Sequence, residues 1–122
     1  MTSPMERTLG VIKKSGLKYW KVEHWNPYAK RRTDLFNIID LLVLDSGIVG
    51  IQVCGTDYQD HVRKLTEDEK ENTLEWLKSE GRLEIWGWRQ LKKVRGKKAM
   101  EWIPRIADIL LVGGSLYVEE RQ

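Results

Sequence analysis

The chain has 122 residues, of which 41% are hydrophobic, and carries a formal net charge of +3. This length suits one domain with a real core, and the hydrophobic fraction excludes an intrinsically disordered chain. The single cysteine excludes an intrachain disulfide, and one cysteine with two histidines is too small a set for a Cys/His zinc site.

The first residues, MTSPMERTLG, lack the apolar core of a signal peptide. Apolar runs elsewhere in the sequence are too short to cross a bilayer. We therefore expect a soluble, cytoplasmic protein without membrane contact.

A helix and then a strand are predicted at the start of the chain. Ser3, Pro4 and Glu6 have the spacing of a helix start, in which Ser3 is the N-cap and Pro4 the first helical residue. Gly16 should end this helix. Residues 17–25 have the composition of a strand with two mixed faces, which suits an outer or partly covered strand.

Residues 34–54 are predicted to form two β-strands joined by a tight turn at 45–47. Asp40 in the first strand and Gln52 in the second are the only polar side chains well inside them. An acidic side chain in such a strand must be hydrogen-bonded, paired or bound to a metal, because an unpaired buried carboxylate is costly. Asp40 is therefore the residue whose surroundings need an explanation.

The second half of the sequence contains a helical region followed by strands. Residues 61–65 suit a short helix, and residues 66–69 have the pattern of a helix start with acids in the first turn, where the helix dipole favours them. This helix should end at Gly81. Residues 82–91 then predict a strand, residues 99–109 predict another, and the tail can add a further short strand or hairpin.

The predicted order is one helix, three strands, a helical region and at least two more strands. We classify the chain as α/β or α+β, a single domain over residues 1–122 with a mixed central β-sheet flanked by helices. The helical region between residues 54 and 82 permits a crossover connection within this sheet.

Three features together resemble the PD-(D/E)XK nuclease superfamily: Glu6 on the first helix, Asp40 in the second strand and the tripeptide Gln52-Val53-Cys54 in the third. They are similar in particular to its small Holliday-junction-resolvase-like and phage-encoded members. That superfamily has an acid on the first helix, an Asp that begins the motif and a (D/E)-x-K pair one strand later. The resemblance covers most of the chain and implies a restriction-endonuclease-like core around one or two magnesium ions.

The resemblance implies a site for Mg²⁺ or Mn²⁺ at the ends of these strands. Asp40 would be the central ligand, Gln52 would add its side-chain carbonyl oxygen, and Val53 its backbone carbonyl. Glu6 stands where the superfamily has its helix acid and would complete the site. Hard oxygen ligands suit magnesium, which lowers the pKa of a bound water and stabilises charge on an attacked phosphate.

Cys54 stands where the superfamily motif has the lysine that orients the attacking water. A thiol is unsuited to that role, so another cation must replace the lysine if the protein is an enzyme. Lys64 or Arg63 on the following helix would stand in for it, with Lys21 or Lys30 as further alternatives, and we name Lys64 as the catalytic candidate. An amino group within hydrogen-bond reach of the acidic cleft would favour catalysis.

The proposed ligands also have ordinary structural interpretations. Asp40 can cap a neighbouring loop or pair with Arg32. Gln52 can be a buried amide with backbone partners, and Glu6 can be a helix-capping residue. The apolar surroundings of Asp40 favour the metal site.

Other polar residues of the same region carry weaker indications. Glu23 and Asp34 are auxiliary ligand candidates that can equally face solvent or begin a strand. His24 and His61 have no clear nucleophile beside them in the pattern, so a catalytic triad is not expected. Cys54 is expected to be a small core residue.

Basic residues are segregated from acidic ones along the sequence. The acids gather in residues 66–80, whereas residues 92–98 are strongly basic. This separation predicts a basic face that binds DNA phosphates and an acidic helix turned away from it. Trp25, Trp86 and Trp88 can stack on bases, although core or interface packing is the more common role of tryptophan. The DNA-binding candidates are Lys30, Arg31, Arg32, Arg63, Lys64 and Arg89.

Taken together, the residues and the resemblance predict a magnesium-dependent DNA endonuclease that selects branched or otherwise structured DNA in phage or prokaryotic recombination and repair. A homodimer is expected, because two symmetric cuts need two active sites. The alternative is a nuclease fold that has lost catalysis and acts as a DNA-binding or protein-binding module. The missing motif lysine supports this alternative.

Overall fold

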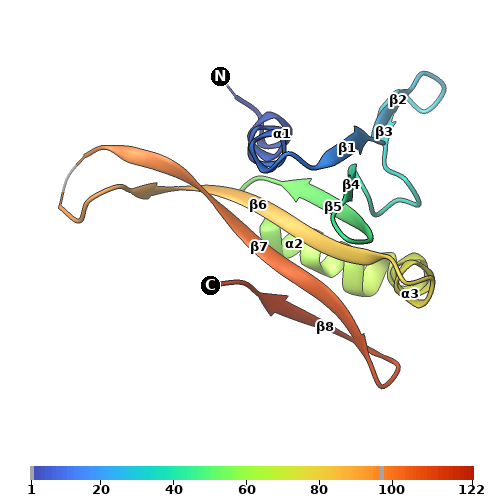
Figure 1. Ribbon diagram of the computed structural model, residues 1–122. Helices are drawn as coiled ribbons and strands as arrows, with labels where there is room; N and C mark the ends of the chain where they lie inside the picture. Colours follow the sequence, from blue (N-terminus) through green and yellow to red (C-terminus); the bar gives the residue numbers. More distant parts are fainter. Residues whose placement is uncertain (1, 97) are drawn as a thin grey trace.

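A helix, a run of strands, a helical segment and three further strands follow one another in the computed structural model (Figure 1). The structure describes residues 2–96 and 98–122. Its elements are α1 (Pro4–Ser15), β1 (Lys18–Lys21), β2 (His24–Asn26), β3 (Arg31–Thr33), β4 (Leu41–Leu44), β5 (Ile48–Cys54), α2 (Tyr58–Arg63), the π-helical turn η1 (Lys64–Asp68), α3 (Lys70–Lys78), β6 (Arg82–Lys92), β7 (Met100–Val112) and β8 (Ser115–Glu120).

Six strands form one mixed sheet in the order β1-β4-β5-β6-β7-β8, and β2 and β3 form a separate two-stranded sheet. Neighbours in the large sheet are antiparallel, except that β6 runs parallel to β5. A parallel pair requires a crossover connection, which α2, η1 and α3 supply. The fold is α+β with a mixed central sheet flanked by helices, and this confirms the predicted class.

Helices cover both faces of the sheet (Figure 1). On one face, Ile12 of α1 packs with Ile51 in a buried apolar cluster. On the other face, Leu65 of η1 packs with Ile85 in a second cluster. Successive side chains of a strand point to opposite faces, so β5 and β6 contribute to both clusters.

Both ends of α1 follow the predicted signals. The Ser3 hydroxyl oxygen accepts a hydrogen bond from the Glu6 backbone N–H at 3.1 Å, and Gly16 ends the helix with a left-handed φ of 75°. The helix is fixed to the sheet by a buried polar contact, because the indole N–H of Trp88 donates to the Thr8 hydroxyl at 2.9 Å. This contact leaves neither of the two buried polar groups unpaired.

Two predicted strands of the N-terminal half have different bounds in the structure. Residues 17–25 are not one strand, because β1 ends at Lys21 and β2 pairs with β3 outside the large sheet. β4 begins at Leu41, so Asp40 lies just before the strand rather than within it. Arg31 and Arg32 belong to β3.

The predicted helix start at Thr66 is wrong. The Thr66 hydroxyl donates to the Val62 carbonyl at 2.8 Å, inside a helical segment that already begins at Tyr58 and passes through η1 into α3. An acid pattern in the first turn of a helix looks the same as one in the middle of a solvated helical face. Further along, β7 extends to Val112, and the tail forms the predicted extra strand, β8.

Two of the three tryptophans considered for base stacking are core residues. Trp86 and Trp88 are 5% and 4% exposed, which leaves no ring face available to a nucleic acid base. Trp25 on β2 is 58% exposed. Among the described residues, no helix combines the length and the apolar character that a membrane crossing needs.

Gly50 of β5 is tightly packed against its neighbours. A Cβ atom at this position would lie 2.6 Å from Cδ1 of Ile39, which is fully buried. We expect Gly50→Ala to lower the free energy of unfolding by about 1–3 kcal/mol, because the overpacked side chains must shift. Gly10→Ala is the matched control, since a Cβ there has no neighbour within 4 Å and should stabilise α1 by about 1 kcal/mol. Urea denaturation measures both values, and equal effects of the two substitutions would contradict the packing argument.

Candidate functional site

The candidate site lies at the end of the sheet where β5 finishes and β4 begins. The Asp40 backbone N–H donates to the Ile51 carbonyl at 2.9 Å, which continues the β4–β5 pairing by one residue. Antiparallel pairing therefore places Asp40 beside Gln52, although twelve positions separate them in the sequence. Both side chains are buried.

A compact turn brings a second acid to the same place. Leu35 and Ile39 form an isolated bridge, with the Leu35 N–H 2.8 Å from the Ile39 carbonyl. Phe36 and Asn37 between them have left-handed φ angles of 53° and 61°, which reverse the chain within a few residues. As a result, Asp34 returns to the start of β4.

The chain between β1 and β2 supplies the third acid. The backbone N–H groups of Val22 and Glu23 both donate to the Asp40 carbonyl, at 3.0 and 3.2 Å. Carboxylate oxygens of Glu23, Asp34 and Asp40 lie within 4.8 Å of one another. Three separate segments of the chain thus bring three carboxylates together. Carboxylate oxygens are the hard ligands that Mg²⁺ prefers.

The Gln52 side chain connects this acidic group to its basic neighbours. Its amide N–H₂ group donates to Asp34 Oδ2 and Asp40 Oδ2, each at 3.2 Å, and to the Ile38 carbonyl at 3.0 Å. Its carbonyl oxygen lies 3.2 Å from Lys64 Nζ and 2.9 Å from His61 Nδ1. The oxygen expected to bind a metal therefore faces Lys64 and His61, and ligation through it requires the amide to turn over.

Lys64 places an amino group within hydrogen-bond reach of the cleft. Nζ donates to Asp34 Oδ2 at 2.8 Å and to Gln52 at 3.2 Å, from the first residue of η1. The sequence alone left open which of several basic residues would supply this group. Arg63, the neighbouring candidate, instead pairs with Asp60 at 3.1 Å on the exposed side of α2.

The two aspartates at the centre of the site have opposite protonation preferences. Burial and the nearby carboxylate of Asp34 together raise the pKa of Asp40 to about 8, although a hydrogen bond from the Val53 N–H acts to lower it. Burial also acts to raise the pKa of Asp34, but hydrogen bonds from Asp40, Lys64 and Gln52 outweigh it, so the pKa falls below its ordinary value. Asp40 thus holds a proton at neutral pH that a cation in the cleft can displace.

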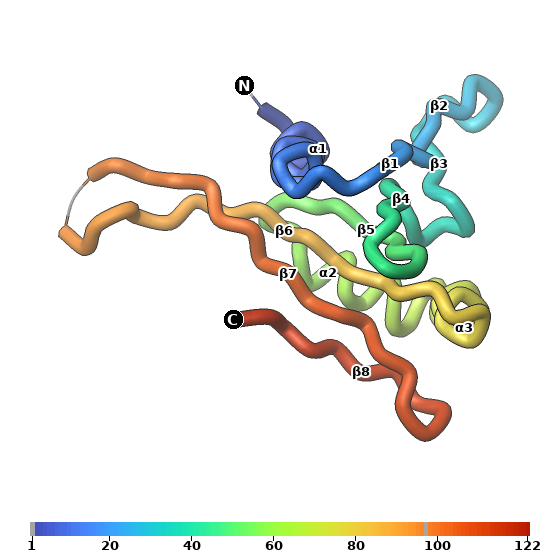
Figure 2. The backbone as a smooth tube through the Cα atoms, viewed as in Figure 1, coloured from blue at the N-terminus to red at the C-terminus, as the bar shows by residue number. Residues whose placement is uncertain are grey.

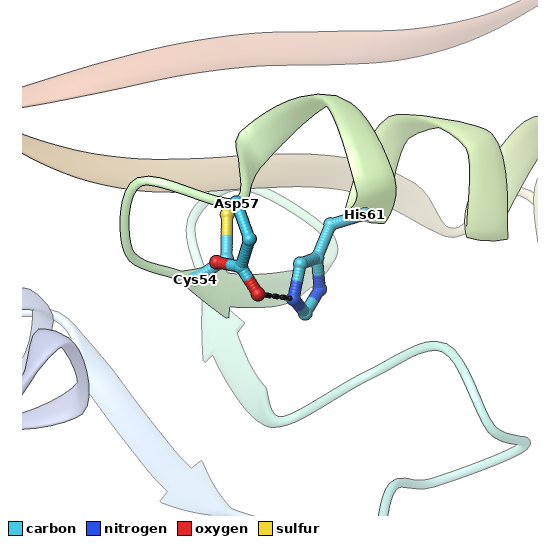
Figure 3. A group of neighbouring side chains, drawn as sticks. All are labelled: Cys54, Asp57 and His61. Carbon is cyan, nitrogen blue, oxygen red and sulfur yellow. Dashed lines mark hydrogen bonds and ion pairs between the residues drawn. The ribbon is translucent and has the colours of Figure 1, made fainter.

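His61 lies at the candidate site, although the sequence pattern gave it no role there, because no nucleophile was found beside it. Nε2 lies 3.0 Å from Asp57 Oδ2 (Figure 3). Nδ1 lies 2.9 Å from Gln52 Oε1. The spacing of His61 and Lys64, three residues apart in a helical segment, could have predicted that both side chains point the same way.

Cys54 lies beside Asp57 and His61 in Figure 3, and the three side chains bring a thiol, a carboxylate and an imidazole together. Burial raises the pKa of the Cys54 thiol to about 12, so it remains a neutral thiol near pH 7. The residue is 5% exposed and packs with Tyr58 in the core, as the sequence predicted. It neither replaces the motif lysine nor offers a hard ligand.

The remaining candidates lie around the site. Glu6 is exposed on α1 and lines a cavity of about 490 Å³ with Glu23 and Val53, but within the described residues the third acid of the trio is Glu23. Arg32 pairs with Glu23 at 3.1 Å, so the alternative ion pair between Arg32 and Asp40 is not formed. Arg31, Arg32 and Lys64 line a second cavity of about 220 Å³ next to Asp34. Lys21 lines the same cavity as Glu6 and Glu23. Lys30 and Arg89 are exposed.

Searches of protein-family models, curated proteins and solved structures find no match to this chain.

The Asp40 carboxyl makes the stability of the metal-free protein depend on pH. Its pKa rises on folding from 3.8 to about 8, so between these values the folded state holds a proton that the unfolded chain releases. Stability should therefore fall as the pH rises through this window. Urea unfolding in EDTA at about pH 5 and about pH 8 should show this loss, and Asp40→Asn should reduce it. An equal loss in the variant would show that another group causes it.

Proposed function

We propose that this protein is a metal-dependent DNA endonuclease whose centre is the carboxylate group of Glu23, Asp34 and Asp40 with the amino group of Lys64. The observation that carries the proposal is the convergence of three acids and one lysine at one end of the sheet. Lys64 pairs with Asp34 and Arg32 pairs with Glu23, whereas the buried Asp40 has no cationic partner of its own among the described residues. A cationic ligand would supply that partner.

The donor set suits Mg²⁺ or Mn²⁺. Glu23, Asp34 and Asp40 offer hard oxygen ligands, and the backbone carbonyl of Val53 follows Gln52 on the same strand end. A bound divalent cation would supply a more acidic water and positive charge beside the attacked phosphate. Asp40 would give up its proton on binding, and Gln52 would then either keep its donor contacts or turn its oxygen inward.

Lys64 takes the role left open by Cys54. Its ammonium group is held between Asp34 and the Gln52 oxygen, at 2.8 and 3.2 Å, and reaches the cleft from η1 instead of β5. A positive charge fixed at this place stabilises charge that develops on a phosphate oxygen. The paired His61 and Asp57 hold the Gln52 oxygen, which in turn orients Lys64.

A basic surface that can bind a phosphate backbone lies beside this centre. Arg31 and Arg32 of β3 line the same cavity as Lys64, and Lys30 precedes them in the turn. Arginine donates in a planar fork that matches phosphate oxygens. The proposal extends to branched DNA as substrate, a homodimer with two cleavage sites, and a cytoplasmic role in phage or prokaryotic recombination and repair.

Cleavage assays test the reaction. Incubation with four-way junction, flap and linear duplex DNA in Mg²⁺ or Mn²⁺ should yield strand cuts with the wild-type protein and none with Asp40→Ala. Lys64→Met should lower the rate by about 10²–10³-fold, because the transition state no longer has this fixed charge beside it. Lys78→Met is the matched control, since Lys78 is exposed on α3. Cleavage that survives Asp40→Ala would overturn the proposal.

Metal titration distinguishes an active enzyme from a nuclease fold that has lost catalysis. The cysteine at position 54 favours the second of these. Calorimetry should detect Mn²⁺ binding to the wild-type protein and its loss in Asp40→Asn. Binding should tighten as the pH rises from about 6 to about 8, because the Asp40 proton is released on binding. A wild-type protein that binds no Mn²⁺ at either pH would support the degenerate fold.

A further inference from the structure

Strands β6 and β7 continue past the end of the central sheet as a two-stranded ribbon (Figures 1 and 2). Cys54, the last residue of β5, pairs with Gly87, whereas β6 runs on to Lys92 and stays paired with β7 as far as Met100. Five residues of β6 therefore extend beyond β5, which corresponds to about 16 Å at the usual rise of a strand. We call residues 88–104 of this hairpin the ribbon; Lys97 in it lies outside the described residues.

The ribbon leaves the sheet at the same end as the carboxylate cluster. β6 runs parallel to β5, so its continuation starts where Gln52 and Cys54 end that strand. Pro4 lines both the cavity that contains Glu23 and a neighbouring cavity lined by Trp102 of the ribbon. The base of the ribbon and the candidate site are therefore adjacent across the start of α1.

Contacts with α1 hold the base of the ribbon in place. The Arg7 guanidinium lies 3.6 Å from the centre of the Trp102 ring, a cation–π contact. Further from the sheet, Leu91 and Val94 are 41% and 57% exposed, although β-strands usually bury one apolar face. The outer ribbon thus presents apolar and basic groups without covering the sheet.

The ribbon is predominantly basic, and Glu101 is the one acid in its sequence. Residues 89–98 contain six basic residues and no acid. Arg89, Lys92, Lys93, Arg95 and Lys98 are exposed, and none of these five forms an ion pair with another described residue. Such a concentration of unpaired cations attracts a polyanion, and it opposes contact with the same ribbon of a second copy.

We propose that the ribbon is a DNA-binding arm that enters a groove of duplex DNA beside the cleavage point. This inference rests on the proposed endonuclease function and assigns its substrate a double-stranded segment next to the cut. The major groove is wide enough for a two-stranded β-ribbon. Lys92, Lys93 and Arg95 would neutralise phosphates along the groove walls, and Leu91 and Val94 would contact sugars and base methyl groups.

DNA affinity tests the arm separately from cleavage. A ribbon variant and a control variant are made in an Asp40→Asn background, and binding to a labelled duplex is followed by fluorescence anisotropy at several salt concentrations. Replacing Lys92, Lys93, Arg95 and Lys98 by alanine should weaken binding about 10- to 100-fold. The slope of log K against log[salt] should fall by about 0.9 for each phosphate that the arm no longer neutralises. The matched control replaces four exposed lysines on α1 and α3 by alanine: Lys13, Lys14, Lys70 and Lys78.

The possible results distinguish the two proposals. If the ribbon variant binds like the control while wild-type protein cleaves DNA in an Asp40-dependent manner, the arm is wrong and the endonuclease stands. If the ribbon variant loses affinity but wild-type protein cleaves nothing, the arm stands and the endonuclease is wrong. A change of oligomeric state on size-exclusion chromatography with unchanged DNA affinity would identify the ribbon as a contact between copies and overturn the arm. Circular dichroism should show that both variants are folded.

Discussion

One amide side chain, that of Gln52, holds the candidate site together. Its N–H₂ group donates to Asp34 and Asp40, and its oxygen lies within hydrogen-bond distance of Lys64 and His61. An amide is the only neutral side chain with this pairing of donors and acceptor, so it can separate two acids from two basic groups inside a buried space. A carboxylate at this position would add a third negative charge beside Asp40, whose pKa is already raised to about 8.

The directions of the strands determine where the Gln52 amide lies relative to Asp40 and to the ribbon. Because β4 is antiparallel to β5, the residue before β4 meets the end of β5, which brings Asp40 to Gln52. Because β6 is parallel to β5, the part of β6 that extends beyond β5 projects from the same end of the sheet. The acidic centre and the basic ribbon are thus neighbours through topology, and a purely antiparallel sheet would have sent the extension of β6 to the opposite edge.

Sequence patterns predicted the parts of the fold that local chemistry decides. The cap at Ser3 and the stop at Gly16 depend on residues a few positions apart, and both are present. The pattern at Thr66 failed because a helix start and a solvated helical face carry the same acids. Asp40 was recognisable as a candidate site residue because a buried acid needs partners. Glu23 was only an auxiliary candidate, because nothing near it in the sequence connects it to that acid.

The sequence by itself determined the ingredients: an α/β or α+β class with a mixed sheet, an acid in an apolar hairpin, a single cysteine at position 54, and a basic segment near residue 95. Only the tertiary structure decided which acids and which cation meet. Glu23, Asp34 and Lys64 reach Asp40 from three separate segments, through backbone hydrogen bonds, a left-handed turn and a helical crossover. Contacts of this kind depend on the path of the whole chain, and spacing along the sequence does not encode them.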